Sequence, residues 1–268
     1  MGPARAARVE GPLITLTELI ACRARTPTLT PGIEPGKFKV VTTRRILARL
    51  EFRHQGHEEI DVAGNQWPLI RAERVALIAD LEGVPDEKWS TQSLCADWTV
   101  RDVLAHITTT AKMTPGKFIA RYAGTGFRFN QFNEIGVKEE QGASPAEAVA
   151  NFKAQLDRTT APPGPIDAMV GEIVIHSQDI RRPLGIAHTF QPEALTLVGN
   201  FVTKGNLLLG GKRRATGLKL TATDVDWTHG EGPEVTGPLA TIILALTGRR
   251  AGLGELSGDG LAILTARV

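Results

Sequence analysis

Residues 168–182 read AMVGEIVIHSQDIRR, and they join an apolar helical segment to polar side chains that such a segment rarely holds. Residues 168–175 are apolar except for Glu172, which is typical of a helix in a protein interior. At 100° per residue, Glu172, His176 and Asp179 share one helix face. We therefore expect a carboxylate and an imidazole in an apolar interface, where an unpaired carboxylate costs several kcal/mol.

A metal ion would compensate for the buried charge. Glu172 and His176 are four residues apart, so their side chains can converge on one ion. The candidate for a third ligand is His106, which lies in the apolar segment 103–107 (VLAHI). Three protein ligands with one open position are typical of catalytic zinc. Two alternatives remain open: a buried Glu–His hydrogen-bonded pair, or a helix whose polar face contacts solvent.

The rest of the chain predicts a mainly α protein in which a helical bundle precedes a small α+β domain. The predicted units are a poorly ordered extension (1–64), a metal-binding bundle (65–210) and the α+β domain (211–268). Apolar spacing and capping residues predict bundle helices at 68–82, 99–113, 144–159, 166–181 and 192–209. A further short helix and an aromatic-rich loop are expected within 117–136.

The C-terminal domain is expected to mix strands with one helix. Alternating apolar residues predict strands at 218–222, 233–236 and 261–267, and an apolar run predicts a helix at 238–247.

Composition excludes several classes of function. Two cysteines, Cys22 and Cys95, do not make a disulfide framework or a cysteine-rich metal site, and they favour a cytoplasmic location. The net charge is +2; residues 1–64 carry 10 basic and 7 acidic residues, which leaves 21 and 22 in 65–268. This near-neutral main unit does not predict a nucleic-acid partner, and no apolar run predicts a membrane span.

Two histidine-bearing segments carry a family resemblance. Residues 89–106 (WSTQSLCADWTVRDVLAH) look like the N-terminal signature of the mycothiol-dependent maleylpyruvate isomerase family, within the DinB-like metal-binding superfamily. Residues 172–185 (EIVIHSQDIRRPLG) resemble its second signature, and 237–249 and 256–260 resemble its C-terminal tail. The resemblance covers about 66–268 and leaves the preceding extension out.

The resemblance implies a DinB-like four-helix bundle with a small C-terminal domain and a divalent metal, usually zinc, held by His106, Glu172 and His176. It implies that mycothiol is the thiol cosubstrate and that its metal-bound thiolate attacks a small-molecule electrophile, in an isomerase or an S-transferase. Asp179 is not a family ligand and is expected to support a ligand or form a salt bridge. The alternative is a non-catalytic DinB-like module that binds a metal or ligand. A monomer or homodimer is expected, and the catalytic residues stay unassigned.

Other residues give weaker signals. Cys95 precedes a helix and could be a nucleophile or a fourth ligand, although a small buried side chain is the favoured interpretation. The basic segment 212–214 could bind carboxylates, but a solvated turn is expected. His188 and His229 are expected to be exposed.

Overall fold

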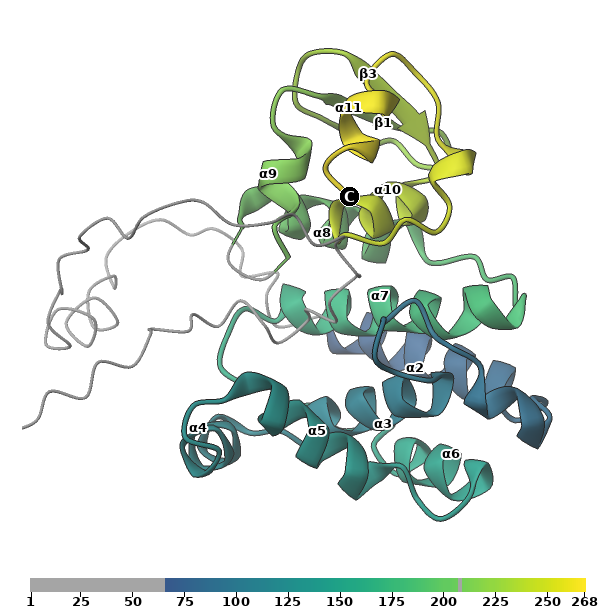
Figure 1. Cartoon of the computed structure of the whole chain (residues 1–268), viewed down its shortest axis with the longest axis vertical. Helices are drawn as coiled ribbons and strands as arrows, with labels where there is room; N and C mark the ends of the chain where they lie inside the picture. The colour runs from purple at the N-terminus through teal and green to yellow at the C-terminus, as the bar shows by residue number, and fades with distance from the viewer. Residues whose placement is uncertain (1–65, 207–208) are drawn as a thin grey trace, which may run out of the picture.

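The helix predicted at 166–181 is α7 (Asp167–Leu184), and the rest of the molecule is arranged around it (Figure 1). The computed structural model describes residues 66–206 and 209–268. The segment from Met169 to Arg181 is buried throughout, although its apolar composition predicts burial only as far as residue 175. The helix ends at Gly185, whose φ of 71° lies in the left-handed region that glycine adopts without strain.

The bundle lies on one side of α7 (Figure 1). Within it α3 packs against α5, α6 and α7, and α2 packs against α6 and α7. Its elements are α2 (Trp67–Leu81), the 3-10 helix η3 (Asp86–Ser90), α3 (Val100–Ala111), α4 (Pro115–Gly124), α5 (Phe129–Glu140) and α6 (Pro145–Lys153).

Side-chain caps place two bundle helices where the sequence predicts them. The Thr99 hydroxyl accepts a hydrogen bond from the Asp102 backbone N–H, and the Asp102 carboxylate accepts one from the Thr99 backbone N–H. This reciprocal capping box starts α3, the helix that carries His106. The Ser144 hydroxyl caps α6 by accepting a hydrogen bond from the Glu147 backbone N–H.

The short helix predicted within 117–136 is α4, which Pro115 starts, because proline fits the first helical position, where its missing N–H has no helical partner. Two other predictions in the bundle are wrong. The aromatic residues placed in a loop belong largely to α5, where Phe129 and Phe132 are buried. The helix predicted to reach residue 159 ends at Lys153. Beyond it, the buried Arg74 side chain donates hydrogen bonds to the backbone carbonyls of Gln155 and Arg158.

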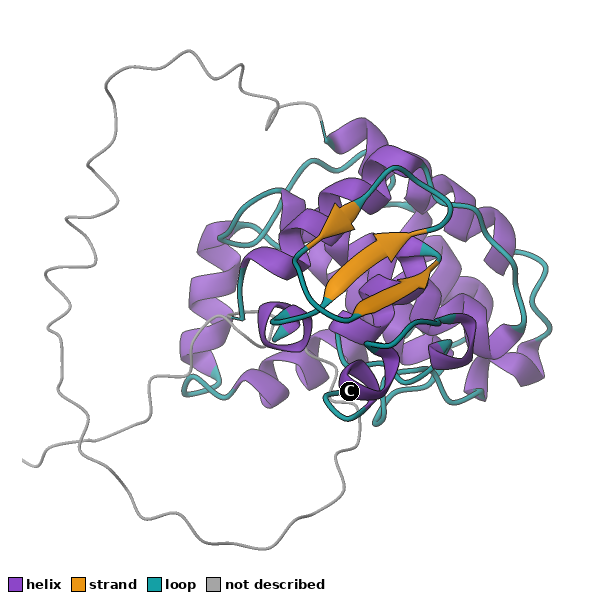
Figure 2. Ribbon diagram, turned by 90° about the horizontal axis from the view of Figure 1, so that it is seen from above, coloured by secondary structure: helices purple, strands orange, loops and turns teal. Residues whose placement is uncertain are grey.

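The C-terminal region lies on the other side of α7 (Figure 1). Its sheet has the order β2-β1-β3, with β1 antiparallel to β2 and parallel to β3, and helices lie beneath it (Figure 2). The elements of this region are α8 (Pro192–Lys204), α9 (Gly211–Ala215), β1 (Lys219–Ala222), β2 (Thr228–His229), β3 (Glu234–Gly237), α10 (Leu239–Leu246), the 3-10 helix η4 (Leu253–Glu255) and α11 (Leu261–Thr265).

The expected mainly helical architecture with a small α+β region is confirmed, but the predicted terminal strand at 261–267 is wrong. This segment forms α11. Of its apolar residues only Leu264 is fully buried, while Ile263 is exposed, which suits one turn of helix on the sheet better than an alternating strand. The two-residue strand β2 is too short to give a periodic signal.

A buried ion pair joins α7 to the C-terminal region. Arg249, just after α10, donates to both carboxylate oxygens of Asp179 at 3.0 and 2.8 Å, and both residues are buried. Helix α8 packs against both α7 and α10, so apolar contacts also hold the two regions together. The domain boundary at residue 210 stays a prediction. No helix in the described parts of the chain is long and apolar enough to span a membrane.

The capping box gives a first prediction. Thr99→Ala removes the hydroxyl acceptor at the start of α3, and we expect the free energy of unfolding to fall by about 1 kcal/mol. Urea denaturation measures this change. Thr223→Ala, at an exposed position, is the control and should shift the free energy by less than about 0.5 kcal/mol.

The buried ion pair gives a second prediction. Asp179→Asn leaves the Arg249 charge buried without its counter-charge, so we expect the free energy of unfolding to fall by about 3 kcal/mol. Arg249→Met, measured alone and together with Asp179→Asn, completes a double-mutant cycle. Additive losses would show that the two residues do not stabilise one another.

Candidate metal centre

The three predicted ligands come together where α3 crosses α7. His106 comes from α3, and Glu172 and His176 come from successive turns of α7. Their potential ligand atoms all lie within 4.8 Å of one another, and all three side chains are buried. The helical spacing of Glu172 and His176 and the packing of α3 on α7 therefore produce one compact cluster.

The donor atoms of the cluster face each other. His106 Nε2 lies 3.1 Å from Glu172 Oε1, and His176 Nε2 lies 3.7 Å from Glu172 Oε2. The two imidazole rings are 5.0 Å apart and almost perpendicular, at 78°. The carboxylate therefore lies between two imidazole nitrogens that come from different helices.

Two atoms of the cluster have no hydrogen-bond partner within the described residues. Glu172 Oε1 and His176 Nε2 are both buried and make no hydrogen bond to the described residues, and the contact of His106 Nε2 with Glu172 Oε1 at 3.1 Å is an ion pair. Burying such groups without a partner costs about 1–3 kcal/mol each. Two imidazole nitrogens and a carboxylate oxygen are a donor set that zinc prefers. The residues therefore fit a divalent metal ion, which would satisfy both atoms.

The electrostatic surroundings keep Glu172 ionised. Burial raises the pKa of this carboxyl group, but the attraction of His106 and His176 more than offsets burial, so its pKa lies below the usual range. The buried guanidinium of Arg74 also interacts with the Glu172 charge. Its own pKa is lowered to about 10 by burial, which the carboxylate opposes. An ionised carboxylate is the form that binds a metal.

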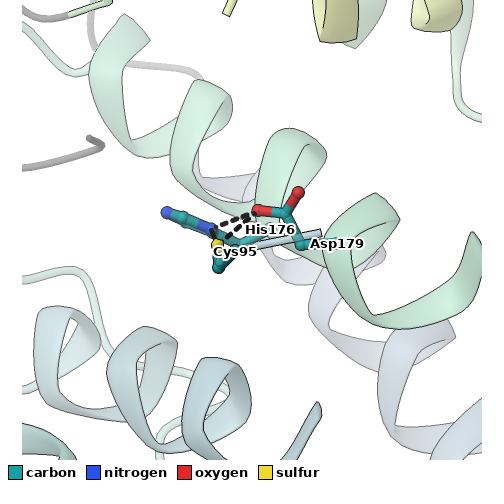
Figure 3. A group of neighbouring side chains, drawn as sticks. All are labelled: Cys95, His176 and Asp179. Atoms are coloured by element: carbon teal, nitrogen blue, oxygen red, sulfur yellow. Dashed lines mark hydrogen bonds and ion pairs between the residues drawn. The ribbon is translucent and has the colours of Figure 1, made fainter. Parts of the chain in front are cut away.

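Asp179 orients His176 from the opposite side of the ring. His176 Nδ1 lies 2.8 Å from Asp179 Oδ2 (Figure 3). Burial raises the pKa of Asp179, but Arg249 and His176 lower it by more, so it lies well below normal. An ionised carboxylate can only accept, so the proton of this bond lies on Nδ1. In the neutral imidazole, Nε2 then carries the lone pair on the side of the cluster, as a metal ligand requires.

Cys95 lies beside this support and not in the ligand cluster. Its Sγ is 3.2 Å from Asp179 Oδ2 and 4.0 Å from His176 Nδ1, so it is on the side of the ring away from Nε2 (Figure 3). Cys95, His176 and Asp179 also lie close enough to hold an ion. However, His176 and Asp179 are already hydrogen-bonded to each other, and Arg249 supplies the positive charge.

Two contacts around the cluster were not predicted from the sequence. The half-buried Trp98 lies over His106, with ring centroids 4.8 Å apart. Arg249 pairs with Asp179 across 70 residues of sequence. The resemblance includes both residues within its matching segments, but no local periodicity relates either residue to its partner.

The weaker candidates lie apart from the cluster. His188 was expected to be exposed but is half-buried, and its Nε2 lies 2.8 Å from Glu73. His229 was also expected to be exposed but is half-buried and stacks on Trp227. Of the basic segment 212–214, the first two residues are exposed, and the third donates to backbone carbonyls.

Comparison with known proteins agrees with this architecture. The chain is similar to a crystal structure of the mycothiol-dependent maleylpyruvate isomerase, with a TM-score of 0.52 and 18% identity over 74% of this chain and 92% of the other. A mutant of that isomerase gives a TM-score of 0.51 and 17% identity over the same shares. At this identity the likeness shows a shared fold.

One family model matches part of the bundle. No curated protein matches the chain. Residues 70–165 match the family model for the mycothiol maleylpyruvate isomerase N-terminal domain, a range that includes α3 and His106. This match and the shared fold make the chain similar to the mycothiol-dependent maleylpyruvate isomerases, with the domain match confined to residues 70–165.

Proposed function

We propose that this protein is a metal-dependent, mycothiol-using enzyme that acts on an electrophilic small molecule, as an isomerase or a thiol S-transferase. The observation that carries the proposal is the convergence of His106, Glu172 and His176, three buried side chains from two helices. Two of their atoms have no hydrogen-bond partner among the described residues. The family of the N-terminal domain supports mycothiol as the thiol.

The residues of the chain have distinct roles in this proposal. His106, Glu172 and His176 would hold the ion, and three protein ligands leave a position for a substrate atom. A zinc ion bound there would lower the pKa of a coordinated thiol and so supply a nucleophile at neutral pH. Asp179 accepts a hydrogen bond from His176 Nδ1 and so keeps His176 Nε2 available to bind the ion. Arg249 keeps Asp179 ionised and fixed.

The isomerase and the transferase share the addition of the mycothiol sulfur to an electrophilic carbon. In an isomerase, sulfur adds to an activated double bond, the resulting single bond rotates, and sulfur leaves as the double bond reforms. In a transferase, the carbon–sulfur bond remains in the product. The proposed cytoplasmic location and a monomeric or homodimeric state are compatible with either reaction.

A second candidate is a non-catalytic module that binds a metal or ligand. Its support is the complete burial of the cluster, since His106, Glu172 and His176 are at most 4% exposed. Such a module would bind zinc and still leave mycothiol unreacted, so turnover separates it from the enzyme.

Metal content is the first test of the proposal. We expect purified full-length protein to hold about one zinc ion per chain and His176→Ala to hold none, because the variant loses one of three ligands. Inductively coupled plasma mass spectrometry measures the ratio. His229→Ala removes a histidine outside the cluster and should keep the full zinc content.

Thiol use is the second test. We expect mycothiol to raise the melting temperature of the zinc-loaded protein more than glutathione or cysteine does, because a ligand that binds only the folded state stabilises it. Product analysis with mycothiol, maleylpyruvate and other electrophiles should then show an isomer or a conjugate. Stabilisation without turnover would favour the non-catalytic module, and stabilisation without zinc would contradict the metal-dependent mechanism.

A further inference from the structure

We propose that Cys95 is a positioning residue: its thiol holds the Asp179 carboxylate against His176 Nδ1 and so keeps His176 Nε2 directed at the ligand cluster. The inference concerns the support of the proposed metal site and rests on that proposed function. It assigns Cys95 a role other than nucleophile, metal ligand or passive core residue.

The thiol contacts both partners of the buried ion pair. Cys95 Sγ lies 3.2 Å from Asp179 Oδ2, a distance at which the S–H group donates to the carboxylate. The same sulfur lies 3.9 Å from Arg249 Nη2, which donates toward it. Cys95 is 0% exposed, so water does not substitute for either contact. The thiol is thus a donor to the anion and an acceptor from the cation.

The Asp179 oxygen that accepts the hydrogen bond from the Cys95 thiol also accepts one from His176. Asp179 Oδ2 accepts from His176 Nδ1 at 2.8 Å and from Arg249 Nη2 at 2.8 Å. Rotation of the carboxylate would lengthen the bond to the imidazole. Three donors on Oδ2, from Cys95, His176 and Arg249, restrict that rotation. Outer-shell contacts of this kind typically change metal affinity by 10- to 100-fold.

The loop that carries Cys95 is fixed on α7 by its backbone. The Leu94 N–H donates to the Asp179 carbonyl at 3.2 Å. The Gln92 side chain donates to the Cys95 and Trp98 carbonyls at 2.7 and 2.8 Å. Trp98, which lies over His106, belongs to the same loop. This loop therefore contacts His106 through Trp98 and the Asp179–Arg249 ion pair through Cys95.

Zinc affinity in matched variants tests the role of the thiol. Cys95→Val keeps a similar volume and removes the donor, and we expect its zinc dissociation constant to rise about tenfold. Cys95→Ser restores a donor and an acceptor and should stay within about threefold of the unmodified protein. Competition with a chromophoric zinc chelator measures both. Val100→Ala, a fully buried packing control, and Cys22→Ala, a control for loss of a thiol, should not change the affinity.

A second measurement detects the hydrogen bond without metal. The S–H stretch of Cys95 can be recorded by infrared spectroscopy in full-length Cys22→Ala protein, where it is the one thiol left in the sequence. We expect the band to move to higher wavenumber when Asp179→Asn removes the charged acceptor. This shift reports the bond itself, which a merely space-filling side chain would not show.

Two results would overturn the inference. One is zinc binding by Cys95→Val as tight as in the unmodified protein, or Cys95→Ser as weak as Cys95→Val. The other is an S–H band that does not respond to Asp179→Asn. If the unmodified protein binds no zinc at all, the proposed function fails, and the S–H band alone then decides whether Cys95 holds Asp179.

Discussion

The hydrogen bond between His176 Nδ1 and Asp179 Oδ2 is the interaction on which the candidate site depends. It fixes the proton on one ring nitrogen and leaves the other as a lone pair facing Glu172. Arg249 makes the arrangement possible, because it compensates for a fully buried carboxylate. A single charge pair therefore links the packing of the C-terminal region to the orientation of a potential metal ligand.

Helix α7 is both buried and rich in ionisable side chains, two properties that usually conflict. Its segment from Met169 to Arg181 is buried against helices on both sides, yet it contains Glu172, His176 and Asp179. The helix separates the polar groups into two sets, one directed at His106 and the other joined to Arg249. Arg249 compensates for the charge of the second set, and the donor atoms of the first set fit a divalent ion.

Much of this arrangement could be predicted from the sequence, because local rules act on it. The i, i+4 spacing of Glu172 and His176 and the cap at Thr99 are short-range features, and the family resemblance included His106. Arg249 could not be paired with Asp179 by any local rule, because the contact depends on the packing of α8 on α7 and of α10 on α8. The terminal segment was misread because alternating and helical apolar patterns are alike over five residues.

The central claim is that two imidazoles and one carboxylate hold a metal whose remaining position accepts a thiol. X-ray absorption at the zinc edge, on the zinc-loaded full-length protein, tests it most directly. We expect only nitrogen and oxygen ligands in the protein alone, and one sulfur at about 2.3 Å after mycothiol is added. A sulfur ligand before mycothiol is added would make Cys95 a ligand, and no sulfur afterwards would exclude the proposed thiol activation.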